Sequence, residues 1–388
     1  MTIRGLRRAV EGLSPYVPGK TIEEVRRELG LESIIKLGSN ENAYAPFPAA
    51  LKAMARELEN SNRYPDIAFE EIKGLIADLH GVSQENIAIS HGAEGMLQAV
   101  VKSFLEEGDE VVIPEATYNL YRELSKLMGA TIVNVPMKGR AIDLEAVKAA
   151  VGEKTKLIWL CNPNNPTGTF FTHDELVELM DHLPEHTWVI LDEAYAEFAP
   201  QGKLPDRGKL PDRGKLIKEG RNILSVRTFS KAYGLAGLRL GYGMARPEMI
   251  TVIDTVSEPF NANRIGIAAG VAVLTEDREA CRRAMGRIIR DRKRLERELE
   301  GLGCRVTPSA TNFVFFETPA DCLTVSKMML KKGVIVRSCD IWGYDHAIRV
   351  TVGTTEEVDR FLKTLRDVLG ELAESNPVTT GDDAHGAI

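Results

Sequence analysis

Apolar residues follow two different spacings between about residues 86 and 275. Short runs that are apolar almost throughout predict strands buried on both faces, and the longer stretches between them repeat apolar residues at helical spacing. This alternation is typical of a parallel sheet covered by helices, so the predicted fold class is α/β. The predicted strands are residues 86–90, 110–114, 131–136, 156–161, 187–192, 222–228 and 240–245, and the predicted helices are residues 93–106, 118–128, 173–182 and 264–275.

The pattern changes after Glu276. A long charged helix at residues 278–301 precedes short apolar runs and further helices, which predicts a smaller α+β unit. Residues 1–40 have too few apolar positions for a core of their own, so we expect them to pack on this unit. The predicted strands of this unit are residues 312–317, 334–337 and 348–352. The predicted domains are a large domain at residues 41–262, a discontinuous small domain at residues 1–40 and 263–373, and a disordered tail at residues 374–388.

Composition limits the kinds of partner. A formal net charge of −7 in 388 residues argues against binding to nucleic acid or anionic membranes through broad electrostatic attraction. No apolar run reaches the ~20 residues that cross a bilayer, and the N-terminus lacks the apolar stretch of a signal peptide, so the expected location is the cytoplasm. Five scattered cysteines suit reduced thiols, and no metal site is predicted. The hexapeptide G-K-L-P-D-R occurs twice in succession, at residues 202–213, and is predicted to be a surface loop.

Polar segments follow four of the predicted strands. H-G-A-E-G follows the strand at residues 86–90, and N-P-N-N-P-T-G follows the strand at residues 156–161. D-E-A-Y begins at Asp192, and T-F-S-K-A-Y-G-L-A-G-L-R begins at Thr228. Because ligands bind at the carboxyl ends of the strands in an α/β sheet, we expect these four segments to form one site.

The four segments carry complementary groups. Backbone N–H groups at the junction of residues 90–93 would be unpaired and could bind an anion, with Thr228, Ser230 and Arg239 completing the site. Asp192, at the end of a buried strand, needs a cation or a good hydrogen-bond donor, because an isolated buried carboxylate is costly.

Lys231 lies in the last of these segments. A lysine in a glycine-rich segment is usually at the surface, but a neutral amine beside a phosphate site and opposite an acid meets the requirements of a Schiff base with pyridoxal phosphate. The order of the four segments together therefore favours an enzyme that uses pyridoxal phosphate over a binding protein.

N-P-N-N-P-T-G, D-E-A-Y and T-F-S-K-A-Y-G-L-A-G-L-R together resemble segments of fold-type-I aminotransferases. S-P-Y-V-P-G-K, K-L-G-S-N-E-N, N-R-Y-P-D, E-P-F-N-A-N-R and I-R-V-T-V-G-T further resemble the histidinol-phosphate aminotransferase family, from about Tyr16 to Leu369. The resemblance implies a mostly parallel seven-stranded sheet in the large domain, pyridoxal 5'-phosphate as cofactor, and a homodimer with shared active sites. Ala43 and Ala45 depart from the family's usual Pro and Gly, and Glu94 stands where aspartate is common.

The resemblance also implies a role for each matching residue. Lys231 would form the Schiff base and carry a proton, and Asp192 would pair with the pyridine nitrogen. Asn165 and Tyr195 would donate hydrogen bonds to the ring oxygen. The other implied cofactor contacts are Tyr118 against the ring face, the backbone of Ala93 and Glu94 with Thr228, Ser230 and Arg239 at the phosphate, and Tyr64 reaching that phosphate from the neighbouring subunit.

Substrate choice is implied to rest on Tyr16, Arg337 and Arg349, which resemble the family's anion clamp. Charge-assisted hydrogen bonds contribute roughly 1.5–3 kcal/mol each, so this set favours a phosphate without excluding a carboxylate. The predicted reaction moves an amino group between histidinol phosphate and 2-oxoglutarate, in histidine biosynthesis. The alternatives are an aromatic amino acid aminotransferase and a threonine-phosphate decarboxylase on the same scaffold.

Overall fold

A seven-stranded sheet forms the centre of the large unit, in the order β2-β10-β9-β8-β7-β3-β4. The computed structural model describes residues 4–11, 13, 19–200 and 210–375. β10 (Leu240–Met244) pairs antiparallel with both neighbours, and the remaining pairs are parallel, so the predicted α/β class with a mostly parallel sheet is confirmed. The other strands are β2 (Ile87–His91), β3 (Glu110–Pro114), β4 (Thr131–Val135), β7 (Thr155–Cys161), β8 (Trp188–Asp192) and β9 (Ile223–Thr228).

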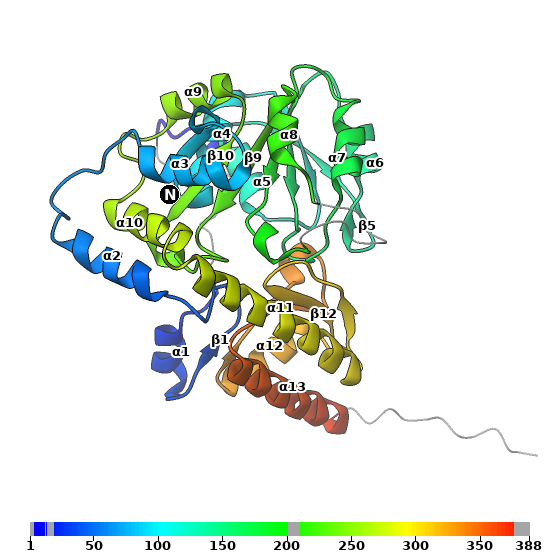
Figure 1. Cartoon of the computed structure of the whole chain (residues 1–388). Helices are drawn as coiled ribbons and strands as arrows, with labels where there is room; N and C mark the ends of the chain where they lie inside the picture. The colour runs from blue at the N-terminus through cyan, green and yellow to red at the C-terminus, as the bar shows by residue number, and fades with distance from the viewer. Residues whose placement is uncertain (1–3, 12, 14–18, 201–209, 376–388) are drawn as a thin grey trace, which may run out of the picture.

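Helices cover both faces of this sheet (Figure 1). Successive side chains of a strand point to opposite faces, so Ile158 and Leu160 belong to one apolar core and Trp159 to the other. Several strands are buried on both faces and apolar almost throughout, as the sequence pattern predicted. The edge strand β4 differs, because Thr131 and Asn134 are exposed. The surrounding helices are α3 (Glu70–His80), α4 (Gly92–Phe104), α5 (Leu120–Leu127), α6 (Leu144–Ala149), α7 (His173–Met180), α8 (Arg213–Lys218) and α9 (Pro247–Val256).

The small unit is built on an antiparallel sheet in the order β11-β12-β15-β14. β1 (Ile35–Lys36) pairs in parallel with β13 (Val334–Ile335), so this part of the N-terminal segment packs on the C-terminal unit. Arg7, earlier in the same segment, instead donates a hydrogen bond to the Leu127 carbonyl at the end of α5 in the large unit. The remaining elements are β11 (Arg305–Thr307), β12 (Phe313–Glu317), β14 (Arg337–Ser338), β15 (Ala347–Thr351), α1 (Ile22–Leu29), α11 (Arg278–Gly301), α12 (Cys322–Lys331) and α13 (Thr355–Ser375).

Two details refine the predicted organisation. The single strand predicted at residues 334–337 is two strands, β13 and β14, because the chain passes there from pairing with β1 to pairing with β15. α10 (Arg264–Leu274) packs on α2 (Pro48–Leu58) and α3, and the division of the chain at residue 262 stays a prediction.

A short hairpin, β5 (Met137–Lys138) and β6 (Ala141–Ile142), follows β4. Residues 376–388, most of the predicted disordered tail, lie outside the described residues, as do residues 201–209 of the duplicated loop. Across the described ranges, no helix combines the length and the apolar character needed to span a bilayer.

β10 passes close to the junction between β2 and α4. A Cβ atom on Gly241 would lie 2.5 Å from the backbone nitrogen of Ala93 and 2.5 Å from the carbonyl carbon of Gly92. Backbone atoms cannot rotate away as a side chain can, so Gly241→Ala should force β10 and the junction apart. We expect a loss of about 1–3 kcal/mol in the free energy of unfolding, measured by urea denaturation.

Gly152→Ala is the matched control for this prediction. A Cβ atom at Gly152 would meet no atom within 4 Å, so its stability should stay within about 0.5 kcal/mol of the parent. Equal unfolding midpoints for Gly241→Ala and Gly152→Ala would contradict the close approach of β10 to the junction.

Candidate active site

A cavity of about 470 Å³ lies at the carboxyl ends of the parallel strands, and residues of both units line it. The structure thus brings together segments that are far apart in the sequence, as the strand-end argument predicted. Twelve predicted site residues line this cavity: Ala93, Glu94, Tyr118, Asn165, Asp192, Tyr195, Thr228, Ser230, Lys231, Arg239, Arg337 and Arg349.

Two predicted site residues are not among those that line the cavity. Tyr64 is 75% exposed and stacks on Phe260, with ring centroids 4.2 Å apart. Its predicted role is in the cavity of a neighbouring subunit, which a single chain does not test. Tyr16 lies outside the described residues.

Lys231 follows β9, and its amine points into the cavity. The Lys231 Nζ donates a hydrogen bond to the Ser39 carbonyl oxygen at 3.0 Å. Burial and, to a smaller extent, the positive charge of Arg349 lower the pKa of Lys231 from 10.5 to about 8, while Glu41 opposes the shift. A lysine with this pKa is neutral, and therefore nucleophilic, far more often near neutral pH than an exposed lysine.

Asp192 ends β8 and is buried beside Lys231. The Tyr121 hydroxyl donates to Asp192 Oδ2 at 2.6 Å, and the Ala194 N–H donates to Oδ1 at 3.0 Å. Tyr121 is itself held by parallel stacking on Trp159, with centroids 5.0 Å apart. Burial nevertheless raises the pKa of Asp192, so a cation placed against this carboxylate would be strongly favoured.

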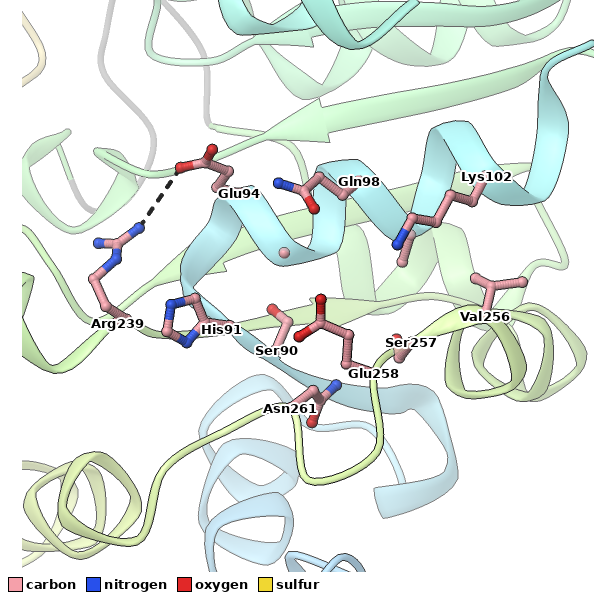
Figure 2. A pocket seen from close by; sticks show the side chains of 12 residues that line it. Ser90, His91, Glu94, Gln98, Lys102, Arg239, Val256, Ser257, Glu258 and Asn261 are labelled. Atoms are coloured by element: carbon pink, nitrogen blue, oxygen red, sulfur yellow. Dashed lines mark ion pairs between the residues drawn. The ribbon is translucent and has the colours of Figure 1, made fainter. Parts of the chain in front are cut away.

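Hydrogen-bond donors surround the start of α4. A Cβ atom on Gly92 would lie 2.8 Å from Arg239 Nη2, so this guanidinium rests directly against the glycine backbone. Figure 2 shows Arg239 facing Glu94 across the first turn of the helix, with an N–O distance of 3.9 Å. The hydroxyls of Thr228 and Ser230 line the same cavity. A helix N-terminus, two hydroxyls and an arginine form a set that suits a phosphate group.

Tyr195 and Asn165, which line the same cavity, both contact residues of the small unit. The Tyr195 hydroxyl oxygen accepts a hydrogen bond from Asn40 Nδ2 at 3.0 Å. Asn165 Oδ1 accepts a hydrogen bond from Arg349 Nη1. Arg349 Nη2 donates to the Gly38 carbonyl oxygen at 2.8 Å. Both side chains line the cavity, as Asp192 does, and both are predicted to bind the ring oxygen of the cofactor.

Arg337 and Arg349 lie directly opposite each other in the β14–β15 ladder. Directly opposed side chains of like charge repel, so two arginines in these positions favour an anion bound against them. Trp342 lies beside both, with its ring centroid 5.9 Å from the Arg337 guanidinium carbon and 5.8 Å from that of Arg349. Trp342 Nε1 also donates to the Thr117 carbonyl at 2.7 Å, which joins the small unit to the segment before Tyr118.

Sequence reasoning missed Asn40, Tyr121 and Trp342. Tyr121 could have been found, because the acid at the end of β8 needs a donor and A-T-Y-N-L-Y places a second tyrosine three residues after Tyr118. Trp342 and Asn40 contact residues more than one hundred positions away, and no local pattern marks them.

The donor set fits pyridoxal phosphate. The cradle at α4 suits its phosphate, the buried Asp192 suits a protonated ring nitrogen, and the Lys231 amine suits its aldehyde. No group of three or more His, Cys, Asp or Glu side chains within the described ranges is arranged to hold a metal ion. The five cysteines, all of them described, are buried and free of disulfides.

A family model for class I and II aminotransferases matches residues 32–365, so the chain belongs to that family. Within that class, histidinol-phosphate aminotransferase 2 of Carboxydothermus hydrogenoformans is 40% identical over 365 residues, which cover 94% of this chain and 99% of that protein. The histidinol-phosphate aminotransferase of Moorella thermoacetica is 38% identical over 370 residues, which cover 95% of this chain and 94% of that protein.

Solved structures agree with this assignment. The crystal structure of the histidinol-phosphate aminotransferase from Sinorhizobium meliloti, in complex with pyridoxal-5'-phosphate, matches with a TM-score of 0.88 at 31% identity, over 96% of this chain and 99% of that one. An aspartate aminotransferase mutant of Thermus thermophilus matches with a TM-score of 0.80 at 23% identity over 95% of this chain and 100% of that one, which shows the shared fold. The predicted fold-type-I architecture is therefore confirmed.

The pKa of Lys231 predicts how the apoprotein takes up pyridoxal phosphate. Only the neutral amine can attack an aldehyde, so the rate of covalent attachment should rise with pH and level off above about 8. A lysine of ordinary pKa would instead keep gaining rate to about 10.5. The measurement is the initial rate at which the visible absorbance of protein-bound cofactor appears, across pH.

Two variants make this test specific. Lys231→Ala should show no covalent attachment at any pH, and its persistence would contradict the assignment of Lys231. Arg349→Met should move the plateau to higher pH, because the Arg349 cation lowers the pKa of Lys231.

Proposed function

We propose that this chain transfers an amino group between histidinol phosphate and 2-oxoglutarate with pyridoxal phosphate as cofactor, in histidine biosynthesis. The observation that carries the substrate assignment is the pair of opposed arginines, Arg337 and Arg349, in the same cavity as the amine of Lys231. The names of the relatives support the same reaction. The predicted cytoplasmic location is part of this proposal and is consistent with five cysteines that form no disulfide.

The cofactor would be held at both ends. Pyridoxal phosphate, when bound, supplies an aldehyde that accepts the amino group and a ring that withdraws electrons from the substrate Cα. The backbone of Ala93 and Glu94 would bind its phosphate together with Arg239, Thr228 and Ser230. Tyr118, which lines the cavity beside Leu97 and Asn119, would lie against the ring face.

The buried Asp192 and the half-buried Lys231 would control the protons. Asp192 would hold a proton at the ring nitrogen, since burial raises the carboxylate's pKa and makes a neighbouring cation favourable. Lys231 would remove the proton from the substrate Cα, because its lowered pKa leaves the amine neutral for part of the population near neutral pH. Asn165 and Tyr195 would donate hydrogen bonds to the ring oxygen.

The anion of the substrate would lie against the two opposed arginines. Arg349 is 7% exposed and already donates to Asn165 and to the Gly38 carbonyl. Arg337 is half-buried, and its guanidinium has no hydrogen-bond or ion-pair partner within the part of the chain that the structure describes. Arg337 is therefore the group most able to bind the phosphate of histidinol phosphate. Arg349 lies opposite it in the β14–β15 ladder and is held by its hydrogen bonds to Asn165 and Gly38.

Rival substrates differ in the anion and in the fate of the carboxyl group. We predict that the holoenzyme reacts with histidinol phosphate with a higher kcat/KM than with phenylalanine, in single half-reactions followed by cofactor absorbance. Arg337→Gln should lower kcat/KM for histidinol phosphate by about 10- to 100-fold, since one charge-assisted hydrogen bond is worth roughly 1.5–3 kcal/mol.

Arg305→Gln is the matched control, because Arg305 is an exposed arginine of the same unit that pairs with Glu317 away from the cavity. Its kcat/KM should equal that of the parent. Reaction with phenylalanine and none with histidinol phosphate would favour the aromatic aminotransferase. Release of carbon dioxide from threonine phosphate would favour the decarboxylase.

We further propose a homodimer in which Tyr64 reaches the cofactor phosphate of the neighbouring subunit. Tyr64 and Phe260 form a stacked pair whose side chains remain 75% and 41% exposed. Leu51, Leu58 and Ile67, on or near α2, are also exposed large apolar residues. Burial of this surface by a second copy would remove apolar area from water and leave Tyr64 beside another cavity.

Mixed dimers test this sharing. Lys231→Ala and Tyr64→Ala subunits should each have low activity at limiting cofactor concentration. When the two are unfolded, mixed in equal amounts and refolded together, about a quarter of the sites should contain both native residues. Activity should then exceed the sum of the separately refolded variants. Activity equal to that sum would contradict a site shared between subunits.

A further inference from the structure

The segment at residues 38–42, G-S-N-E-N, contacts several site residues at once. The Gly38 carbonyl accepts from Arg349 Nη2 at 2.8 Å, and the Ser39 carbonyl accepts from Lys231 Nζ at 3.0 Å. Asn42 Nδ2 donates to the Ala232 carbonyl at 2.9 Å. This loop follows β1, so the small unit supplies it to a cavity built on the large sheet.

Asn40 is the most deeply buried residue of this segment, at 1% exposure. Its backbone N–H donates to Thr351 Oγ1 at 2.9 Å, and its carbonyl accepts from Asn312 Nδ2 at 3.0 Å. Its φ of 56° lies in the left-handed region, which asparagine tolerates better than most residues. The backbone of Asn40 is therefore fixed on both sides by hydrogen bonds to the small unit.

These contacts also fix which way the Asn40 amide points. Thr351 Oγ1 accepts from the Asn40 backbone, so its own proton is free to donate to Asn40 Oδ1 at 3.2 Å. With the oxygen held by Thr351, the amide nitrogen faces the Tyr195 hydroxyl at 3.0 Å. The Tyr195 oxygen is thus an acceptor on this side, and its proton must point elsewhere.

We propose that Asn40 is a positioning residue that keeps the hydroxyl proton of Tyr195 directed into the cavity, toward the ring oxygen of the bound cofactor. Within the described ranges, no acceptor for that proton lies at hydrogen-bond distance, and Tyr195 lines the cavity. Because the ring oxygen belongs to the cofactor, this role depends on the proposed function.

Burial keeps the Tyr195 hydroxyl protonated. Burial raises the pKa of Tyr195, and the charges of Cys161 and Asp192 raise it further when these groups ionise. The positive charge of Arg349 and the hydrogen bond from Asn40 oppose this shift without cancelling it. Tyr195 is therefore able to donate a hydrogen bond at neutral pH.

Asn40→Asp reverses the direction of this hydrogen bond. A carboxylate of almost the same shape can still accept from Thr351, but it can only accept from Tyr195 as well. The hydroxyl proton should then turn from the ring oxygen toward Asp at position 40. Loss of that donor makes the ring oxygen more basic, so the pKa at which the visible absorbance of the bound cofactor changes should rise.

The experiment is a pH titration of cofactor absorbance in four holoenzymes: the parent, Asn40→Asp, Tyr195→Phe and the double variant. Each single variant should raise the apparent pKa by about 1, the equivalent of one lost hydrogen bond. The double variant should show less than the sum of the two shifts, because Asn40 acts through the hydroxyl that Tyr195→Phe removes. Additive shifts would overturn the role of Asn40, since a purely electrostatic effect of the new charge persists without the hydroxyl.

Two further variants complete this design. Asn42→Asp places the same charge in the same segment without contacting Tyr195, so any shift it causes should be additive with Tyr195→Phe. Thr351→Val removes the hydroxyl that orients the amide and adds no charge, so it tests the role even if Asn40→Asp does not fold. Its upward shift should be present with Tyr195 and absent with Phe at that position, and an equal shift in both backgrounds would contradict the role.

The titration also separates this role from the proposed function. A parent protein that binds no pyridoxal phosphate would contradict the proposed function itself. A parent protein that binds the cofactor, with additive shifts in the double variant, would contradict only the role of Asn40.

Discussion

The site depends on burying charge at the carboxyl edge of the sheet. Asp192 is buried and Lys231 is half-buried, and this burial moves the pKa of the carboxyl up and that of the amine down. Both shifts favour neutral forms, which is useful for the amine and unfavourable for a carboxylate that must hold a cation. The Tyr121 hydroxyl and the Ala194 N–H donate hydrogen bonds to the Asp192 oxygens, and these bonds stabilise the ionised carboxylate.

The same constraint explains why the cavity needs both units. Strand ends of the large sheet place Asp192, Thr228 and Lys231, but the groups that contact Lys231 and Tyr195 come from residues 38–42. That segment leaves β1, which is anchored by its pairing with β13. Arg337 and Arg349, which we propose to bind the substrate anion, likewise lie on β14 and β15 of the small sheet. A change in how the units pack would therefore alter the cofactor site and the substrate site together.

Sequence patterns predicted the elements whose signals are local. Short apolar-rich runs, several of them almost continuously apolar, predicted all seven strands of the large sheet, and the segments that follow these strands indicated Asp192 and Lys231. Asn40 and Tyr195 are 155 positions apart, and nothing in S-N-E-N indicates a tyrosine partner. The split of residues 334–337 into β13 and β14 was also out of reach, because it depends on which neighbouring strands are present rather than on the residues themselves.

The positions of the strand ends are fixed on the far face of the sheet as well. Glu193 directly follows Asp192 and Arg227 directly precedes Thr228, so alternation turns both away from the cofactor face. Glu193 is fully buried, accepts from Ser225 Oγ at 2.6 Å and lies 3.7 Å from an Arg227 nitrogen.

A shift between β8 and β9 would break the hydrogen bond from Ser225 to Glu193 and separate Glu193 from Arg227, so these buried contacts oppose it. The Glu193 N–H also donates to the Val226 carbonyl at 2.9 Å, which continues the ladder one residue beyond Asp192. Charge burial on one face therefore holds in register the two strand ends from which Asp192 and Thr228 extend on the other.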